Sequence, residues 1–230
     1  MNEIVSVGAR IKVAFETTPG VRPAEGFKTV LNVTEAPEIA LSLETIDVSN
    51  IMDLITRYVP GRQNPGGEKQ FTMNHSDDGI VDWNTLVALA ETKKASGLRC
   101  WWEYRYPNAA NSFFFCGTPQ MLGNSGITGN SASTLSGSVV FEEYGGWLPH
   151  STEITPSAAE TTVAVGSTTT VTLTHSVGAI GVTSSNPGVA TATESSGTVT
   201  ITGVKAGTSI FTFKDGNMDS CKVVVEVTAA

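Results

Sequence analysis

The sequence predicts a mainly β protein with two domains. Residues 1–149 would form a β-sandwich or barrel with one flanking α-helix, and residues 150–230 a smaller β-sandwich. Three observations support this. Alternating apolar and polar residues recur along the chain, as in strands with one buried face. One segment has helical periodicity. After His150 the composition shifts towards Thr, Ser, Val and Gly, and short strand-like runs follow one another.

The strands of the first domain are predicted from this alternation. In a strand within residues 4–16, Ile11, Val13 and Phe15 share one face, and Arg10, Lys12, Ala14 and Glu16 share the other. The strongest strand covers residues 98–106, with Leu98, Cys100, Trp102, Tyr104 and Tyr106 on one face and Arg99, Trp101, Glu103 and Arg105 on the other. Further strands are expected at residues 27–33, 39–45, 70–73, 112–118, 120–122 and 134–144. Gly137 indicates a bulge in the last strand, and residues 145–149 end it.

The aromatic residues of 98–118 allow two interpretations. They could form a sugar-binding platform, or a sheet core with aromatic cross-strand pairs. The core is favoured, because the strands that carry these residues already need a buried face.

One helix is expected after residue 82. Asp82 is the predicted N-cap, and Trp83, Leu86, Val87 and Ala90 form an apolar face at helical spacing. Lys93 and Lys94 complement the helix dipole and Gly97 ends the helix. The preceding His75-Ser76-Asp77-Asp78-Gly79 could belong to a metal or catalytic site. A polar turn is favoured, because a calcium loop needs more oxygen ligands at defined positions and no nucleophile motif is present.

The second domain is predicted to consist of regularly spaced short strands. They are expected at residues 153–155, 161–165, 169–175, 189–194, 198–202, 207–214 and 221–228. The expected core comprises Val163, Val165, Val171, Leu173, Val189, Val199, Ile201, Ile210, Phe211 or Phe213, and residues 223–227.

Residues 41–73 contain an unusual loop. Strand-like residues at both ends enclose Ile51, Met52, Leu54, Ile55, Tyr58 and Val59 together with Pro and Gly. Long hairpin loops are usually functional or disordered, and disordered segments are poor in large apolar residues. We therefore expect this loop to cover something: either its own domain, as a lid, or a neighbouring copy of the protein.

Composition excludes several classes of protein. The chain has 230 residues, 40% of them hydrophobic and 16% charged, with a formal net charge of −8. It has no Lys or Arg cluster, so tight nucleic-acid binding is not expected. No apolar stretch approaches the ~20 residues of a membrane span, and no signal peptide is expected at the start. The odd count of three cysteines predicts free thiols in a reducing compartment, with a Cys100–Cys116 bridge as the alternative.

The segment "TIDVSN…RYVPGRQNPGGEKQFTM" resembles the major tail proteins of long-tailed, siphovirus-type phages, in which a T-x-D-x-S/T element leads through a Y-x-P-G loop into a strand. The resemblance runs from about Val13 to Gly146. It implies a tail-tube β-sandwich whose copies form stacked hexameric rings, a conduit for DNA within the virion that is assembled in the host cytoplasm. It also implies tape-measure, tail-tip and tail-terminator proteins as partners, with no membrane. The long loop would contact the neighbouring subunits through Ile46, Asp47, Ile51, Met52, Leu54, Ile55, Tyr58, Val59, Pro60 and Gly61.

Residues 152–228 resemble the bacterial immunoglobulin-like group 2 domain, through "SSNPGVATAT", "GTVTITGVKAGTSIFTF" and "CKVVVEVT". The resemblance implies a module displayed outside the tube, with weak host-surface glycan contact as an option. The alternative for the whole protein is a cell-surface adhesin or carbohydrate-binding protein. No enzyme, metal or cofactor is expected, because His75, His150 and His175 lack the spacing of metal ligands.

Overall fold

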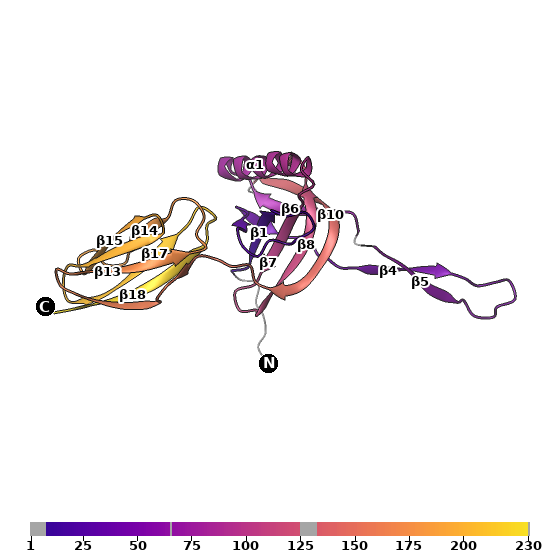
Figure 1. Ribbon diagram of the computed structural model, residues 1–230. Helices are drawn as coiled ribbons and strands as arrows, with labels where there is room; N and C mark the ends of the chain where they lie inside the picture. Colours follow the sequence, from indigo (N-terminus) through magenta and orange to yellow (C-terminus); the bar gives the residue numbers. More distant parts are fainter. Residues whose placement is uncertain (1–7, 65, 125–132, 230) are drawn as a thin grey trace. The chain divides into compact units, whose positions relative to one another are not determined.

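The computed structural model describes residues 8–64, 66–124 and 133–229. The described chain forms two compact units (Figure 1). The first contains the residues up to Arg22 together with Val30–Pro149, and the second contains Pro23–Thr29 together with the chain from His150 onward. The fold is mainly β, as predicted, and the described residues contain one α-helix. None of this helical structure is long and apolar enough to cross a membrane.

A curled antiparallel sheet forms the first unit (Figure 1). Its strand order is β1-β7-β8-β10-β6-β3, and β9 pairs with β10 outside this path. The bounds are β1 Arg10–Phe15, β3 Val33–Glu35, β6 Glu68–Asn74, β7 Cys100–Arg105, β8 Asn111–Pro119, β9 Gly123–Asn124 and β10 Thr134–Pro149.

Helix α1 (Asp77–Lys94) packs its apolar side on this unit, with Trp83, Leu86 and Ala90 buried. Asp82 is not the N-cap, so that prediction was wrong. Ser76 is extended and its Oγ accepts a hydrogen bond from the Gly79 backbone N–H at 3.1 Å. The helix therefore begins at Asp77, six residues earlier than the expected first residue Trp83.

Aromatic rings dominate the core between helix and sheet. Phe71 stacks on Trp102 at 5.2 Å between ring centroids, and Trp102 stacks on Phe115 at 6.1 Å. Trp83 lies 5.8 Å from Trp102. These rings are buried, so they form a core and offer no platform for a sugar.

Three strand predictions were wrong in detail. Residues 27–33 do not form one strand, because Asn32 has a positive φ of 61° and separates β3 from the residues before it. The short strand expected at 120–122 lies at Gly123–Asn124 instead. The closing strand does not end at residue 144: β10 continues to Pro149, with register shifts near Phe141 and Tyr144.

Gly137 is not at a bulge. It pairs in regular register with Phe71, and a Cβ at this position would lie 2.7 Å from the Trp83 ring. The glycine is therefore needed for close approach of the helix to the sheet.

The second unit is a sandwich of two sheets, with orders β11-β13-β16-β15 and β12-β18-β17-β14. The bounds are β11 Thr155–Pro156, β12 Glu160–Ala164, β13 Thr168–Thr174, β14 Gly181–Ser184, β15 Ala190–Ser195, β16 Thr198–Gly203, β17 Gly207–Lys214 and β18 Ser220–Thr228. Strand β14 was not predicted. Phe211 and Phe213 are both buried, and Ile210, which was expected in the core, is 42% exposed because it alternates with them.

Residues Pro23–Thr29, which end in β2 (Lys28–Thr29), are hydrogen-bonded into the second unit. The Thr152 N–H donates to the Ala24 carbonyl at 2.8 Å, and the Thr29 N–H donates to the Asn217 carbonyl at 3.1 Å. Glu25 pairs with His175 at 2.7 Å. Nothing in the alternation of the sequence indicates this grouping of distant segments.

Candidate assembly surface

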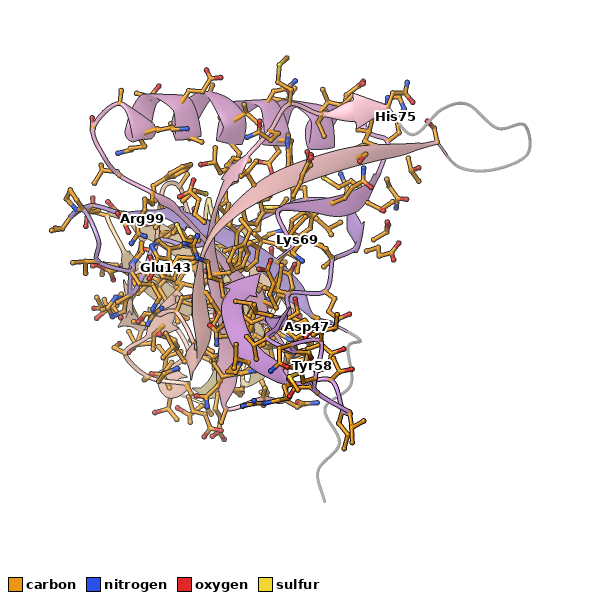
Figure 2. All side chains as sticks on the ribbon, turned by 90° about the vertical axis from the view of Figure 1, so that its right-hand side faces the viewer. Asp47, Tyr58, Lys69, His75, Arg99 and Glu143 are labelled. Carbon is orange, nitrogen blue, oxygen red and sulfur yellow. The ribbon has the colours of Figure 1, made fainter. Side chains whose placement is uncertain are left out.

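Strands β4 (Ser42–Asp47) and β5 (Tyr58–Asn64) form a separate two-stranded antiparallel sheet in the first unit (Figure 1). We call residues 42–64 the arm and residues 48–57 its tip. Ile46 lies opposite Val59, and Asp47 lies opposite Tyr58 as the last pair before the tip (Figure 2). All ten residues of the predicted contact surface therefore lie on one hairpin.

The apolar side chains of the arm are exposed. Ile51 and Leu54 are 103% and 101% exposed, which is as much as in an isolated residue. Seven further apolar side chains of the arm are also exposed: Leu43, Ile46, Val48, Met52, Ile55, Tyr58 and Val59. The hairpin therefore does not fold over its own unit as a lid. Contiguous exposed apolar surface of this kind is typical of an interaction site.

Short polar side chains organise the tip. The Asp47 carboxylate accepts from the Ser49 N–H at 2.8 Å, the Asn50 side chain accepts from the Met52 N–H at 2.9 Å, and the Ser49 hydroxyl accepts from the Arg57 N–H at 2.8 Å. The side-chain and backbone hydrogen bonds from Ser49 lower the pKa of Asp47. These bonds fix the backbone of the tip while its apolar side chains point into solvent.

Pro60 and Gly61 are compatible with strand β5, which has only one neighbouring strand. Pro60 has no N–H to donate, which is tolerated because β5 has no second neighbour in the sheet. A Cβ on Gly61 would lie 3.0 Å from the Glu44 carbonyl and 3.2 Å from the Ile46 side chain. Gly61 thus allows β4 and β5 to approach closely beside the bulge between Leu43 and Thr45.

The first unit contains a cleft of 740 Å³ that was not predicted from the sequence. Its walls combine residues 9–11, the segment 33–39 and aromatic side chains from β7, β8 and β10. Trp147 is 56% exposed, stacks on Tyr106 at 6.1 Å and meets the edge of Phe113 at 5.5 Å. The Tyr104 hydroxyl donates to the Pro37 carbonyl at 3.1 Å and ties the two walls together. Trp147, Leu148 and Pro149 follow two glycines without alternation of apolar and polar residues, so the sequence carried no signal for the position of Trp147.

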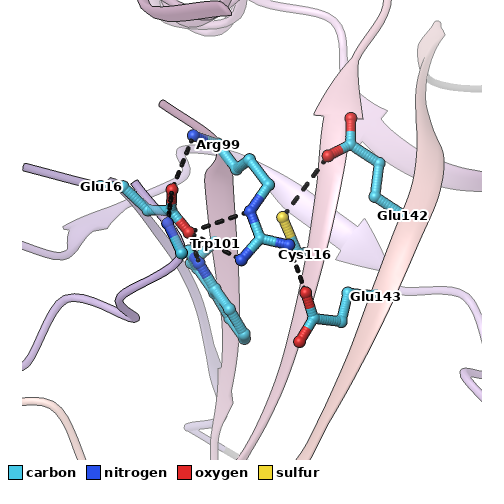
Figure 3. A network of polar contacts seen from close by, with 7 residues as sticks. Glu16, Arg99, Trp101, Cys116, Glu142 and Glu143 are labelled. Atoms are coloured by element: carbon cyan, nitrogen blue, oxygen red, sulfur yellow. Dashed lines mark hydrogen bonds and ion pairs between the residues drawn. The ribbon is translucent and has the colours of Figure 1, made fainter. Parts of the chain in front are cut away.

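A second set of polar residues lies on the opposite face of the sheet (Figure 3). Glu16 is fully buried and accepts from the Arg99 N–H at 3.2 Å, the Arg99 Nε–H at 3.0 Å and the Trp101 indole N–H at 2.9 Å. Arg99 also pairs with Glu143. Burial raises the pKa of Glu16, but hydrogen bonds from Trp101, Gly20 and Arg99 outweigh it and lower the pKa overall.

The buried thiols next to this network are not reactive, so its role is structural. The Cys116 thiol donates to Glu142 at 3.6 Å, and burial raises the pKa of Cys116 well above its ordinary value. Burial does the same for Cys100. Both thiols are therefore protonated and poor nucleophiles at neutral pH. The structure has Cys100, Cys116 and Cys221 as free cysteines, so the Cys100–Cys116 bridge is not formed.

The segment from His75 to Gly79 serves the start of α1 (Figure 2). His75 Nδ1 lies 3.0 Å from the Ser133 hydroxyl, Ser76 caps the helix, and Asp77 and Asp78 occupy its first turn. Across the residues that the structure describes, no three His, Cys, Asp or Glu side chains gather in a way that could hold a metal ion.

Comparison with protein-family models finds no match, and comparison with curated protein sequences finds none either. Among solved structures, the chain is similar to part of the anti-feeding prophage baseplate, with a TM-score of 0.40 and 5% identity over 59% of this chain and 89% of that chain. It is also similar to the tail of an empty GTA particle, with a TM-score of 0.39 and 13% identity over 64% and 98% of the two chains. A surface-layer protein, SbsC, gives a TM-score of 0.31 and 16% identity over 55% of this chain and 25% of that chain. With TM-scores below 0.5, we draw no argument from these likenesses.

Proposed function

We propose that this protein is a structural component of a virion tail, built from many copies that join through the arm. More specifically, we propose the major tail protein of a siphovirus-type phage, with hexameric rings stacked into a tube and the second unit displayed outside. The observation that carries the proposal is the exposed apolar arm. The tail-protein resemblance of "TIDVSN…RYVPGRQNPGGEKQFTM" supports the particular assignment.

The energetics of the arm fit repeated weak contacts. Fully burying one Leu- or Ile-sized side chain stabilises by about 1.5–3 kcal/mol, so the four apolar side chains Ile51, Met52, Leu54 and Ile55 offer roughly 6–12 kcal/mol. Association itself costs about 4–15 kcal/mol. One arm contact is therefore weak or marginal, whereas a ring and a stack of rings multiply the contacts per copy. Assembly of this kind is cooperative.

The charge of the chain suits a conduit for DNA. Residues 1–149 hold 11 Lys and Arg against 16 Asp and Glu, and residues 150–230 hold 3 against 6. Both parts are mildly acidic, so phosphate backbones would be repelled and not retained. Tape-measure, tail-tip and tail-terminator proteins as partners, and assembly in the host cytoplasm, belong to the same proposal and follow from the resemblance.

The adhesin alternative has less support. Residues 150–230 contain two aromatic side chains, Phe211 and Phe213, and both are fully buried. Aromatic faces are the usual amphipathic surface for recognition at an interface. Residues 150–230 therefore offer no Phe, Tyr or Trp surface on which a sugar ring could stack.

The test uses a variant whose hairpin stays intact. In Ile51→Ser/Leu54→Ser/Ile55→Ser, which we call the tip variant, the hydrogen bonds of the tip are retained and its apolar surface is removed. We expect rings or tubes of the unchanged protein in negative-stain electron microscopy, and monomers of the tip variant at the same concentration. Val81→Ser/Leu89→Ser is the control, because these exposed apolar residues lie on α1 away from the arm.

Two outcomes would overturn the proposal. Normal tubes from the tip variant would show that the arm is not the contact. An unchanged protein that stays monomeric at high concentration, and does not add to isolated tail-tip complexes, would exclude the tail-tube function itself.

A further inference from the structure

We propose that the cleft beside Trp147 is the acceptor for the arm tip of a second copy of this chain. This inference rests on the proposed function and names the surface that the arm would contact.

The cleft has the size and lining of a binding site. Its volume of 740 Å³ lies within the range of about 300–1,000 Å³ that is typical of ligand pockets. Five aromatic side chains line it: Tyr104, Tyr106, Phe113, Tyr144 and Trp147. Trp147 and Tyr144 are exposed, yet each is held by a contact with the Phe113 ring, at 5.5 and 5.2 Å. The apolar wall is therefore formed before anything binds.

The tip cannot fill the cleft of its own copy. Ile39, in the wall of the cleft, is separated from β4 by only two residues. The six residues of β4 then extend for roughly 20 Å at a strand rise of about 3.3 Å per residue. While β4 and β5 stay paired, the tip lies at the far end of this ladder. The occupant must come from another copy.

The tip and the cleft are complementary in polarity. Asp53 lies in the tip, and Asp47 lies in the last strand pair before it; both are near the apolar residues Ile51, Met52, Leu54 and Ile55 in the sequence. The cleft carries charges of both signs, Arg10 and Arg105 on its strand wall and Glu35 and Glu38 on the segment 33–39, next to the aromatic rings. The apolar side chains of the tip would thus meet the aromatic rings of the cleft.

The contact is head-to-tail. The donating tip and the accepting cleft are different surfaces of the same chain, so each copy can donate to one neighbour and accept from another. Such heterologous interfaces generate closed rings or open helical assemblies, and not closed pairs. The geometry thus agrees with the stacked or ring-like assembly of the proposed function.

The test is site-specific photo-crosslinking of the full chain. Leu54 is replaced by p-benzoylphenylalanine, and this chain is mixed with an equal amount of isotopically heavy chain that lacks the crosslinker. After assembly and irradiation, mass spectrometry identifies the crosslinked peptides. We expect light-to-heavy crosslinks to residues 33–39, 104–113 or 144–147. A crosslinker at Val81 on α1 serves as the control and should not reach these segments.

A pair of variants tests the acceptor from the other side. Tyr144→Ala/Trp147→Ala, the cleft variant, should lower the yield of the Leu54 crosslink at least tenfold, whereas Met121→Ala should leave it unchanged. Met121 is also an exposed apolar residue of the first unit, and it does not line the cleft. Thermal unfolding followed by tryptophan fluorescence confirms that each variant is folded.

The outcomes separate this inference from the proposed function. Leu54 crosslinks to another copy that map outside the cleft would overturn the acceptor and leave the arm as the assembly contact. Assembled protein without any crosslink between copies would overturn both the acceptor and the role of the tip. Crosslinks within one copy would show that the tip reaches its own unit and would also overturn the inference.

Discussion

Glu16 is a buried charge that accepts several hydrogen bonds in the network of Figure 3. Its carboxylate is fully buried and satisfied by Arg99, Trp101 and Gly20. Arg99 extends the network to Glu143 on β10, so one guanidinium group connects the residue that follows β1 with a residue of β10. Removing a partner from such a network leaves buried groups without hydrogen bonds, which costs more than the network contributes as a whole.

We therefore expect Glu16→Gln to destabilise the first unit by about 1–3 kcal/mol at pH 7. The pKa of Glu16 is lowered in the folded state, so its contribution is complete above its ordinary pKa of 4.5 and is lost as pH falls through the folded value. As the pH falls below about 5, the unchanged protein should therefore lose stability more steeply than the variant. Urea unfolding followed by tryptophan fluorescence measures this, because all four tryptophans lie in the first unit.

Glu143→Gln is the matched control. Glu143 pairs with the same arginine, but its side chain is half exposed, so the loss should be below about 1 kcal/mol. Equal pH dependence of the Glu16 variant and the unchanged protein would contradict the assignment.

Gly137 sets the distance between α1 and the sheet. A Cβ would meet the Trp83 ring at 2.7 Å and the Met73 methyl at 3.0 Å, both in the core. We expect Gly137→Ala to destabilise the first unit by about 1–3 kcal/mol through overpacking. Gly123→Ala, also in a strand paired with β10, would meet atoms no closer than 3.5 Å and should have little effect. Equal losses in the two variants, measured by urea unfolding, would argue against overpacking.

At the scale of elements, helix α1 is capped by Ser76 and not by Asp82, the residue that was predicted for this role. Asp82 precedes the apolar positions and has the residue type of a cap, but Ser76 starts the helix earlier and places Asp77 and Asp78 in its first turn. Ser76 also accepts from the Asn32 side chain at 2.7 Å, which ties the helix start to the turn before β3. The apolar spacing of Trp83, Leu86 and Ala90 identified the helix correctly, because burial has the same period wherever the helix begins.

Ser76→Ala should therefore destabilise the first unit by about 0.5–2 kcal/mol, the usual effect of losing an N-cap. Thr92→Ala is the control: Thr92 is exposed on the same helix and bonds only to the Ala88 carbonyl, at 3.0 Å, so alanine should be neutral or slightly stabilising. Urea unfolding with tryptophan fluorescence compares the two. A larger loss from Thr92→Ala would contradict the position of the cap.

What the sequence could predict depends on how local the signal is. The strands around Val13, Trp102 and Val171 follow from alternation with near neighbours. The arm was recognisable because Ile51, Met52, Leu54 and Ile55 are too apolar for a disordered loop. The cleft was not, because its walls come from four stretches that are far apart in the sequence and meet only in the folded sheet.

The continuation of β10 to Pro149 illustrates the same limit. Gly145 and Gly146 read as a break, yet a Cβ on Gly145 would lie 2.7 Å from the Trp101 ring and 2.8 Å from the Phe114 carbonyl. The glycine is required by close packing on the second face of the sheet, and β10 passes through it with a register shift. Local sequence chemistry does not distinguish a glycine that ends a strand from one that lets a strand pass a bulky neighbour.

At the scale of the whole molecule, the two units have separate cores. The core around Trp102 and the core around Phe211 share no residue. The donating arm and the accepting cleft both belong to the first unit. Assembly through them needs nothing from the second unit, whose role in the proposed virion would be display and not construction of the tube.

A head-to-tail contact makes a specific prediction for mixtures of defective chains. The tip variant keeps an intact cleft, and the cleft variant keeps an intact tip. Each should be monomeric alone, because neither can form the contact with itself. Mixed in equal amounts, they should form one-to-one dimers and nothing larger, since the dimer has one productive contact and its remaining tip and cleft are both defective.

Sedimentation velocity at high protein concentration measures these species, and each variant alone at the same total concentration is the control for nonspecific association. Because one contact offers only a few kcal/mol after the cost of association, the dimer should be weak and should dissociate on dilution. Mixtures that restore rings or tubes would show that the two surfaces do not form a single contact. Mixtures that stay monomeric at every concentration would show that the tip of one copy does not bind the cleft of another, and that the arm and the cleft serve separate neighbours.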